Sequence, residues 1–351
     1  MHQFHDLTIT AIQQEPNAVV WTLAIPEKLC DQFEYLPGQH LTFKYMHEGE
    51  ELRRSYSICS SSLNASEMKV LIKGVDGGRF SQAAQSVFNV GDTVSVMPPS
   101  GHFSITPEEE KTYVAFSAGS GITPVMGMVH AVLEQTETSQ FVLFYGNSTS
   151  GDILLQQEIS HLKDHYQERF SVHYFLSRQK VDMPFNHGRL DQGKVAYIKD
   201  HFLNQLNVDG YYVCGPGEMI DSVCRSLELL GVPQEQIHNE RFLSDGQEIT
   251  ASEKIIKEDA GITVTVDGAN HQFDIKAGES ATLLESAEQA GVDLPYSCKA
   301  GVCATCRCKL IEGEVEMINN YSLEEWETKD GYILSCQSVA RSSKIHISFD
   351  E

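Results

Sequence analysis

Basic residues are scarce in this chain of 351 residues, in which 26 lysines and arginines accompany 49 aspartates and glutamates. The formal net charge is −23 at pH 7, so nucleic acid and anionic membranes are poor partners. The imbalance grows toward the C-terminus, because residues 258–351 contain 17 acidic and 7 basic residues. Such an acidic segment is usually a solvated surface, and it could also steer a basic protein partner.

Long hydrophobic runs are absent as well. No apolar stretch approaches the ~18 residues of a membrane span, and runs such as FVLFY at 141–145 fit core strands. The first ten residues, MHQFHDLTIT, have neither the basic start nor the apolar core of a secretory signal. We therefore expect no membrane insertion, a cytoplasmic location and reduced cysteine thiols.

Four of the nine cysteines lie in the segment CKAGVCATCRC, and their spacing is informative. Four residues separate Cys298 from Cys303, two separate Cys303 from Cys306, and Cys336 follows after a further 29. Structural zinc sites favour two compact pairs, whereas only one such pair is present. The run C-x4-C-x2-C with a distant fourth cysteine is that of plant-type 2Fe–2S proteins. The spacing therefore favours a 2Fe–2S cluster over zinc or plain buried thiols.

The pattern of apolar and turn residues divides the chain into three domains. Residues 1–105 alternate short β patterns with turns, which is typical of an antiparallel barrel. Residues 106–243 alternate strands with helices, which predicts a doubly wound parallel sheet. A polar linker is expected over 244–259, followed by a compact β-rich domain over 260–351 that carries the cysteines. Cys308, outside the spacing, is expected to be a small buried side chain.

Two motifs in the first domain could bind phosphate or an aromatic ring. In RRSYSI, alternation along a strand puts Arg54 and Tyr56 on one face, where they offer a guanidinium fork and a flat ring. An ordinary half-buried strand has a similar pattern. In GVDGGRFS, glycines precede Ser81 at the start of a helix, where exposed amides bind phosphate. Taken alone, this motif is better explained by a simple N-cap serine.

Two further motifs lie where the second domain should bind a ligand. The segment AGSGITP follows a strand and opens a helix, and Gly119 and Gly121 would let a diphosphate approach the backbone. It lacks the full G-x-G-x-x-G fingerprint. The segment CGPGEM begins at Cys214, at the end of a later strand, and the carboxyl ends of such strands bind ligands.

In this order, the motifs RSYS, GRFS, AGSGITP and CGP resemble those of the ferredoxin–NADP reductase family, with a plant-type ferredoxin fused behind. The resemblance covers nearly the whole chain. It implies an antiparallel β-barrel FAD domain, a parallel-sheet NAD(P)-binding domain and a β-grasp ferredoxin domain. Segments such as RRSYSICS, IKGVDGGRFS and LIEGEVEMINNYSLEEW are similar to the reductase subunits of phenylacetyl-CoA epoxygenases, and steroid hydroxylase reductases share the layout.

The resemblance also implies roles for individual residues. Tyr56, Ser57, Cys214 and Glu240 would be catalytic, with Tyr56 against the isoalloxazine, Ser57 near its reactive nitrogen and Cys214 near the nicotinamide. The cofactor-binding residues would be Arg54, Tyr56, Ser57, Gly78 and Ser81 for FAD, Gly119, Gly121, Thr123 and Pro124 for the nicotinamide nucleotide, and Phe242, with Glu240, close to the flavin. Local packing is the alternative explanation for each of these residues. For Thr123 and Pro124, helix capping and the preference for proline in the first helical turn explain them almost as well.

The choice between the two nicotinamide nucleotides depends on LSRQ at 176–179. Members of the family that prefer NADPH often have Ser-Arg there, and an arginine such as Arg178, after Ser177, suits a 2′-phosphate. We expect NADPH, with NADH as the alternative. Arg189 could assist or simply face solvent.

The resemblance implies an electron route from NADPH to FAD, then to the 2Fe–2S cluster on Cys298, Cys303, Cys306 and Cys336, and on to a partner oxygenase such as a diiron epoxygenase. Nicotinamide gives two electrons together, the cluster accepts one, and a flavin can do both. The alternatives are a reductase of a hybrid-cluster or other redox protein, an electron-carrier or redox-sensing module without NAD(P)H turnover, and a zinc-stabilised scaffold.

Overall fold

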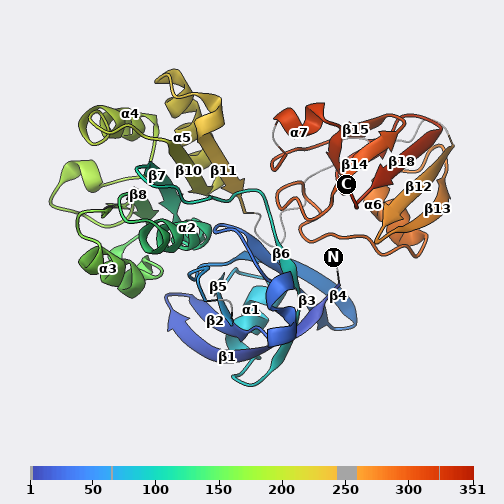
Figure 1. Cartoon of the computed structure of the whole chain (residues 1–351), viewed down its shortest axis with the longest axis horizontal. Coiled ribbons are helices and arrows are strands. Elements are labelled where there is room, and N and C mark those ends of the chain that lie inside the picture. Colours follow the sequence, from blue (N-terminus) through green and yellow to red (C-terminus); the bar gives the residue numbers. More distant parts are fainter. Residues whose placement is uncertain (1–2, 65, 243–258, 324) are drawn as a thin grey trace.

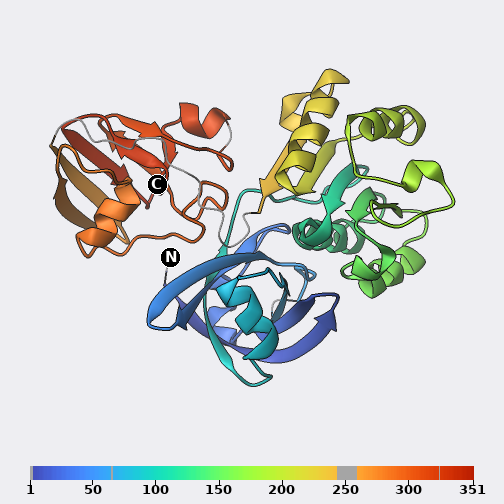
Figure 2. The same cartoon turned by 180° about the vertical axis from the view of Figure 1, so that it is seen from behind.

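A computed structural model describes residues 3–64, 66–242, 259–323 and 325–351. The chain forms three lobes arranged around a common centre. The view from behind shows the same lobes next to one another (Figures 1 and 2). Residues 244–258 of the expected linker lie outside the described residues. None of the helices in the described ranges is long and apolar enough to cross a membrane.

The N-terminal lobe is a six-stranded antiparallel sheet in the order β4-β3-β6-β1-β2-β5. A bridge between Ile58 and Val70 joins its two edges, so the sheet curls toward a barrel. Trp21, Phe43 and Phe80 fill the interior, and Phe80 comes from the helix α1. The elements are β1 (His5–Glu15), β2 (Ala18–Ala24), η1 (Glu27–Gln32), β3 (His40–His47), β4 (Glu50–Ser57), β5 (Glu67–Lys73), α1 (Arg79–Ser86) and β6 (Thr93–Ser100).

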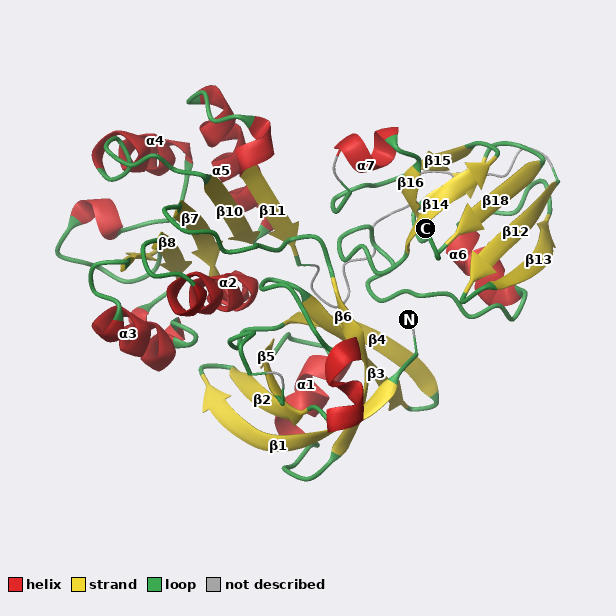
Figure 3. Ribbon diagram, in the orientation of Figure 1, coloured by secondary structure: helices red, strands yellow, loops and turns green. Residues whose placement is uncertain are grey.

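The middle lobe is a five-stranded parallel sheet in the order β11-β10-β7-β8-β9. Helices connect successive strands along the chain (Figure 3). The strand β7, TYVAFSA, is apolar almost throughout because helices cover both faces of a parallel sheet. The elements are β7 (Thr112–Ala118), η2 (Gly119–Gly121), α2 (Ile122–Gln135), β8 (Gln140–Asn147), η3 (Ser150–Asp152), α3 (Gln156–His165), β9 (Phe170–Leu176), η4 (Pro184–Asn186), α4 (Gln192–His201), β10 (Gly210–Gly215), α5 (Gly217–Leu229), η5 (Gln234–Gln236) and β11 (Ile237–Arg241).

The strand order of the middle lobe reverses between β7 and β10. In parallel sheets, ligands bind outside the carboxyl ends of the strands at such a reversal. The loop after β7 and the turn after β10 both lie there, and these are the segments AGSGITP and CGPGEM. The edge strand β11 was not expected, because its sequence IHNER has no apolar alternation. It forms by pairing with β10 along five residues.

The C-terminal lobe packs the helix α6 against a mixed sheet in the order β13-β12-β18-β14-β16. The last strand, β18, lies between β12 and β14 and runs parallel to β12. A capping box between Thr282 and Glu285 starts α6. The elements are β12 (Ala260–Val266), β13 (Ala269–Ile275), α6 (Leu283–Gln289), β14 (Arg307–Glu312), β15 (Val315–Met317), α7 (Glu325–Lys329), β16 (Tyr332–Leu334), β17 (Ser338–Ala340) and β18 (Lys344–Ser348).

Candidate functional site

The four cysteines of the predicted cluster gather in two pairs. The thiols of Cys298 and Cys303 are hydrogen-bonded, as are those of Cys306 and Cys336, and Cys336 also lies within electrostatic range of the first pair. Within the described parts of the chain, no three metal-binding side chains gather as a single-ion site would need. In a 2Fe–2S cluster, each of the two irons is bound by two cysteine thiolates. The residues present therefore fit that group.

The backbone around these thiols is shaped to favour negatively charged sulfur. Lys299 and Ala304 have left-handed φ values of 53°, and Gly301 has a φ of 75°. The amide of Ala300 donates to the sulfur of Cys298 at 3.3 Å. The hydrogen bond with Cys303 and the neighbouring amides together outweigh burial and lower the pKa of Cys298.

The side chain of Gln337 holds the cysteine loop in this conformation. Its amide nitrogen donates to the carbonyl of Lys299 at 2.9 Å, and its oxygen accepts from Asn319 at 3.3 Å. A Cβ atom at Gly301 would lie 3.0 Å from Gln337 Cγ and 3.1 Å from the carbonyl oxygen of Asn319. Gly301 is therefore needed both for its positive φ and for this close contact. Cys308 lies buried on β14, within electrostatic range of Cys336.

The predicted FAD residues of the barrel lie along β4 and at the start of α1. The rings of Tyr56 and Phe80 stack with their centroids 5.5 Å apart, which brings the RSYS strand against the GRFS turn. Arg54 shares a strand face with Tyr56, and its guanidinium donates to the carbonyl of Arg53 at 2.8 Å. The structure thus brings together two segments that are separated by twenty residues in the sequence.

The glycine turn before α1 is ordered by its serine. Ser81 is buried, accepts from the amide of Val75 at 3.3 Å and donates to the carbonyl of Gly78 at 3.4 Å. Gly78 is the N-cap residue of α1, so no side chain caps this helix. Ser81 therefore shapes the turn whose amides would face a phosphate, rather than capping the helix by its side chain.

Three of the predicted catalytic residues meet where the barrel touches the middle lobe. Ser57, at the end of β4, donates to a carboxylate oxygen of Glu240 at 3.5 Å. Glu240 on β11 lies directly opposite Cys214 on β10. Burial, and then the nearby Cys303, raise the pKa of Glu240 to about 8, against the effect of the hydrogen bond from Ser57. Burial and then Glu240 raise the pKa of Cys214.

The nucleotide loop after β7 is built on close backbone contact. A Cβ atom at Gly121 would lie 2.2 Å from the carbonyl oxygen of Cys214, so only glycine lets the two ends of β7 and β10 approach. Gly119 has a φ of 56°, and its carbonyl accepts from the hydroxyl of Tyr145 at 3.0 Å. Ser117, at the end of β7, has a buried hydroxyl without a hydrogen-bond partner among the described residues. A polar atom of this kind fits a ligand at the carboxyl edge.

The other predicted nucleotide residues are spread more widely. Thr123 and Pro124 are buried in the first turn of α2, and the hydroxyl of Thr123 donates to the carbonyl of Ser120 at 3.0 Å. Ser177 and Arg178 lie just beyond β9, two strands from β7, and Arg178 is exposed. Phe242 directly follows β11 and is 39% exposed. The structure therefore does not bring Ser177, Arg178 and the glycine loop into direct contact.

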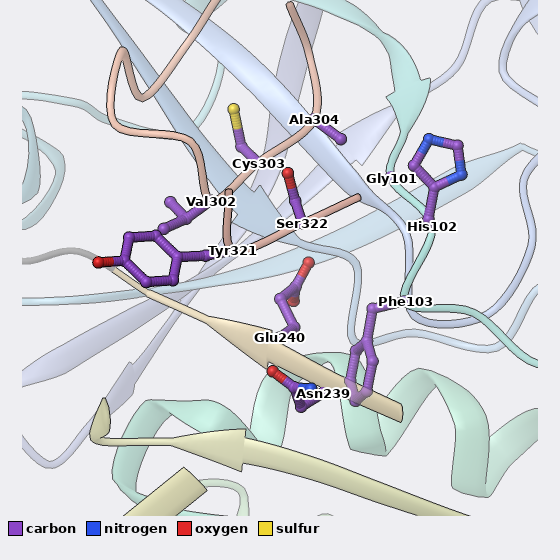
Figure 4. Close-up of a pocket in the computed structure, with 10 residues that line it drawn as sticks. All are labelled: Gly101, His102, Phe103, Asn239, Glu240, Val302, Cys303, Ala304, Tyr321 and Ser322. Atoms are coloured by element: carbon purple, nitrogen blue, oxygen red, sulfur yellow. The ribbon is translucent and has the colours of Figure 1, made fainter. Parts of the chain in front are cut away.

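A small pocket opens where the three lobes meet. Figure 4 shows Glu240 rising from β11 toward the loops of the C-terminal lobe, beside the segment that follows β6. The lining residues are Gly101, His102, Phe103, Asn239, Glu240, Val302, Cys303, Ala304, Tyr321 and Ser322. The carboxylate next to Ser57 thus shares one pocket with a predicted cluster ligand.

Sequence reasoning missed His40, which joins all three lobes at this point. One ring nitrogen of His40, on β3, lies 3.5 Å from the hydroxyl of Thr305 and 3.3 Å from that of Ser100. The other lies 3.9 Å from a carboxylate oxygen of Glu240. Burial, and then the neighbouring His102, lower the pKa of His40 to about 4, so the ring is neutral at pH 7. No local signal could identify it, because Thr305 is 265 residues away.

Comparison with known proteins assigns a family to each lobe. Residues 10–105 match the family described as Oxidoreductase FAD-binding domain, 116–225 the Oxidoreductase NAD-binding domain, and 264–341 the 2Fe-2S iron-sulfur cluster binding domain. The chain is also 40% identical to one of the subunits of 1,2-phenylacetyl-CoA epoxidase from Escherichia coli (strain K12), over 100% of its own length and 99% of that protein. The chain belongs to the oxygenase reductase family.

Other oxygenase reductases agree with this membership. The ferredoxin reductase component of 3-ketosteroid-9-alpha-monooxygenase from Rhodococcus rhodochrous is 30% identical, with 98% of this chain and 96% of that protein covered. The solved structure of phthalate dioxygenase reductase has a TM-score of 0.60 at 22% identity, covering 99% of this chain and 98% of that one. It shares the fold of all three lobes.

The comparisons confirm the expected family, fold class and reaction class. As an oxygenase reductase, the chain is an oxidoreductase with FAD-, NAD- and 2Fe–2S-binding domains, and it passes electrons to an oxygenase. The roles of single residues and the domain boundaries stay predictions.

Proposed function

We propose that this oxygenase reductase takes hydride from NADPH and delivers single electrons, by way of FAD and the 2Fe–2S cluster, to a diiron epoxygenase of the phenylacetyl-CoA type. The 40% identity to a subunit of the E. coli phenylacetyl-CoA epoxidase, over the whole of both chains, supports this partner. Each NADPH carries two electrons in its hydride, so it should reduce two equivalents of a one-electron acceptor.

The observation that carries the proposal is the convergence of three segments on one pocket. Ser57 ends the strand predicted to hold FAD, Glu240 lies beside the strand that bears Cys214, and Cys303 belongs to the cluster loop. A carrier that converts hydride into single electrons has to lie between the nicotinamide and the cluster. The meeting of the three segments provides such a place.

The predicted site residues have distinct tasks in the proposal. Bound FAD would supply the conversion of hydride into single electrons, and the cluster would accept them one at a time. Tyr56 would offer its ring to the isoalloxazine, while Arg54 and the turn at Gly78 would bind the pyrophosphate. Ser57 and Glu240 are hydrogen-bonded to each other, and they would hold a proton near the reactive nitrogen of bound FAD.

The preference for NADPH is proposed from the charge just beyond β9. Arg178 is exposed at the carboxyl edge of the sheet, and its guanidinium could pair with a 2′-phosphate. A charge-assisted contact of this kind contributes about 1.5–3 kcal/mol, which corresponds to a roughly 10- to 100-fold difference in affinity.

An anaerobic absorption titration with NADPH and NADH, run separately, tests the electron route. The flavin and 2Fe–2S bands should both bleach, and NADPH should act at the lower concentration. Arg178→Gln should raise the KM for NADPH about 10-fold or more while leaving kcat and the KM for NADH unchanged. Arg225→Gln, which removes an exposed arginine from α5, is the matched control. An equal rise of both KM values would contradict the role of Arg178.

The proposed partner is tested separately, by mixing the protein with the other subunits of the E. coli epoxidase. Consumption of phenylacetyl-CoA that depends on NADPH and on this chain is the expected result. If both chromophores bleach but no phenylacetyl-CoA is consumed, the electron route stands and the partner is wrong.

A further inference from the structure

The strand β4 presents two kinds of contact on its two faces. Side chains alternate along a strand, so Arg54 and Tyr56 point to the side predicted to hold FAD. Arg53 and Ser55 point the other way, and both reach the C-terminal lobe. In Figure 1 this lobe lies beside the end of the barrel that carries β3 and β4.

Arg53 makes an unusually complete set of contacts for an arginine on a barrel surface. Its side chain is only 7% exposed. One guanidinium nitrogen donates to the carboxylate of Asp293 at 3.0 Å, and another donates to the carbonyl of Leu294 at 3.3 Å. The guanidinium carbon lies 4.1 Å from the centroid of the Tyr296 ring, within cation–π range. The third nitrogen donates to Glu51 on the same strand at 2.8 Å.

The segment held by Arg53 leads directly into the cluster loop. Asp293, Leu294 and Tyr296 are followed by Ser297, and the next residue is the predicted ligand Cys298. The buried hydroxyl of Ser297 accepts from Ser55 at 2.8 Å. Two side chains of β4 therefore fix the five residues that precede the first cysteine.

We propose that Arg53 is a positioning residue that docks the ferredoxin lobe on the barrel, so that β4 holds the flavin with Arg54 and Tyr56 on one face and the cluster loop with Arg53 and Ser55 on the other. The inference rests on the proposed electron route, because it concerns the step from flavin to cluster. The side chain of Arg53 contacts Glu51 and the C-terminal lobe. Arg53 meets Arg54 through its backbone carbonyl, which a side-chain substitution leaves in place, so we expect hydride transfer to the flavin not to depend on the guanidinium. Lysine cannot replace it fully, since a lysine has no planar fork and stacks less well on Tyr296.

Rapid mixing of the anaerobic holoprotein with NADPH separates the two steps. Flavin bleaching should be as fast in Arg53→Gln as in the unchanged protein, whereas the cluster signal, followed by freeze-quench electron paramagnetic resonance, should appear about 10-fold more slowly. Arg53→Lys should give an intermediate rate. Arg341→Gln, which breaks an arginine–glutamate pair inside the ferredoxin lobe, should leave both steps unchanged.

Small-angle X-ray scattering gives a readout that needs no electron transfer. Loss of the Arg53 contacts shifts the balance toward undocked ferredoxin lobes, so Arg53→Gln should have a larger radius of gyration than the Arg341→Gln control. If Arg53→Gln does not retain FAD, the double variant Asp293→Asn, Tyr296→Leu removes the same contacts from the ferredoxin side. It should retain FAD and slow the cluster signal at least several-fold.

The outcomes are distinguishable. Cluster reduction as fast as in the unchanged protein, in either Arg53→Gln or the double variant, would overturn the inference, and so would flavin and cluster steps that slow equally. A failure of NADPH to reduce flavin and cluster in the unchanged protein would instead overturn the proposed function. A normal flavin step, a slowed cluster step and an expanded molecule would together support the docking role.

Discussion

His130 links the barrel to the nucleotide domain through a charged network, and its removal should change stability in a pH-dependent way. Its two ring nitrogens lie 2.8 Å from a carboxylate oxygen of Glu134 and 2.7 Å from one of Glu158. Glu134 also accepts from Ser61, which belongs to the barrel. The network therefore joins α2, α3 and the loop after β4. We consider the variant His130→Gln.

The size of the effect follows from the pKa. Burial alone would lower the pKa of His130, but the hydrogen bonds to Glu134 and Glu158 outweigh it and raise the pKa to about 9. An unfolded histidine has a pKa of about 6.5, and each unit of difference is worth about 1.4 kcal/mol. The charged ring therefore contributes roughly 2–4 kcal/mol of folding stability below pH 6.5. That contribution falls as pH rises and is lost above about pH 9.

Thermal unfolding of the holoprotein between pH 6 and pH 9.5 tests this reasoning. The melting temperature of His130→Gln should lie about 4–10 °C below that of the unchanged protein at pH 6, and the two should approach each other by pH 9.5. His161→Gln, which removes a histidine from the exposed face of α3, is the control. A gap of constant size across this pH range would refute the charged pairing of His130.

Two substitutions separate the cluster from the nucleotide site. Cys336→Ser should abolish the 2Fe–2S signal and electron delivery to a partner, while NADPH-driven ferricyanide reduction, which needs only flavin, stays largely intact; loss of both with normal FAD content would contradict this division. Gly121→Ala puts a Cβ atom against the carbonyl of Cys214. It should lower the free energy of unfolding by about 1–3 kcal/mol, or raise the KM for NADPH while FAD is retained. Gly193→Ala, whose Cβ would meet nothing closer than 3.6 Å, is its control, and equal behaviour of the two variants would contradict the packing argument.

The features that could be predicted from the sequence were those encoded over short stretches. The spacing of Cys298, Cys303 and Cys306 reflects one loop around one cluster, and AGSGITP combines a strand end, a turn and a helix start in seven residues. The strand β11 could not be predicted, because IHNER is polar and becomes a strand only by pairing with β10. The contact between Arg53 and Asp293 joins residues 240 apart, and no local pattern encodes such a contact.

The central place of β18 in the ferredoxin sheet has a consequence for biosynthesis. The neighbours of this strand, β12 and β14, cannot complete their pairing until Lys344–Ser348 has left the ribosome, about eighty residues after β12. The barrel and the nucleotide domain can fold earlier, since domains generally fold as units during synthesis. Capture of iron and sulfide would then be the final step of maturation, and an electron could leave the flavin for the cluster only in a molecule whose other two domains were already in place.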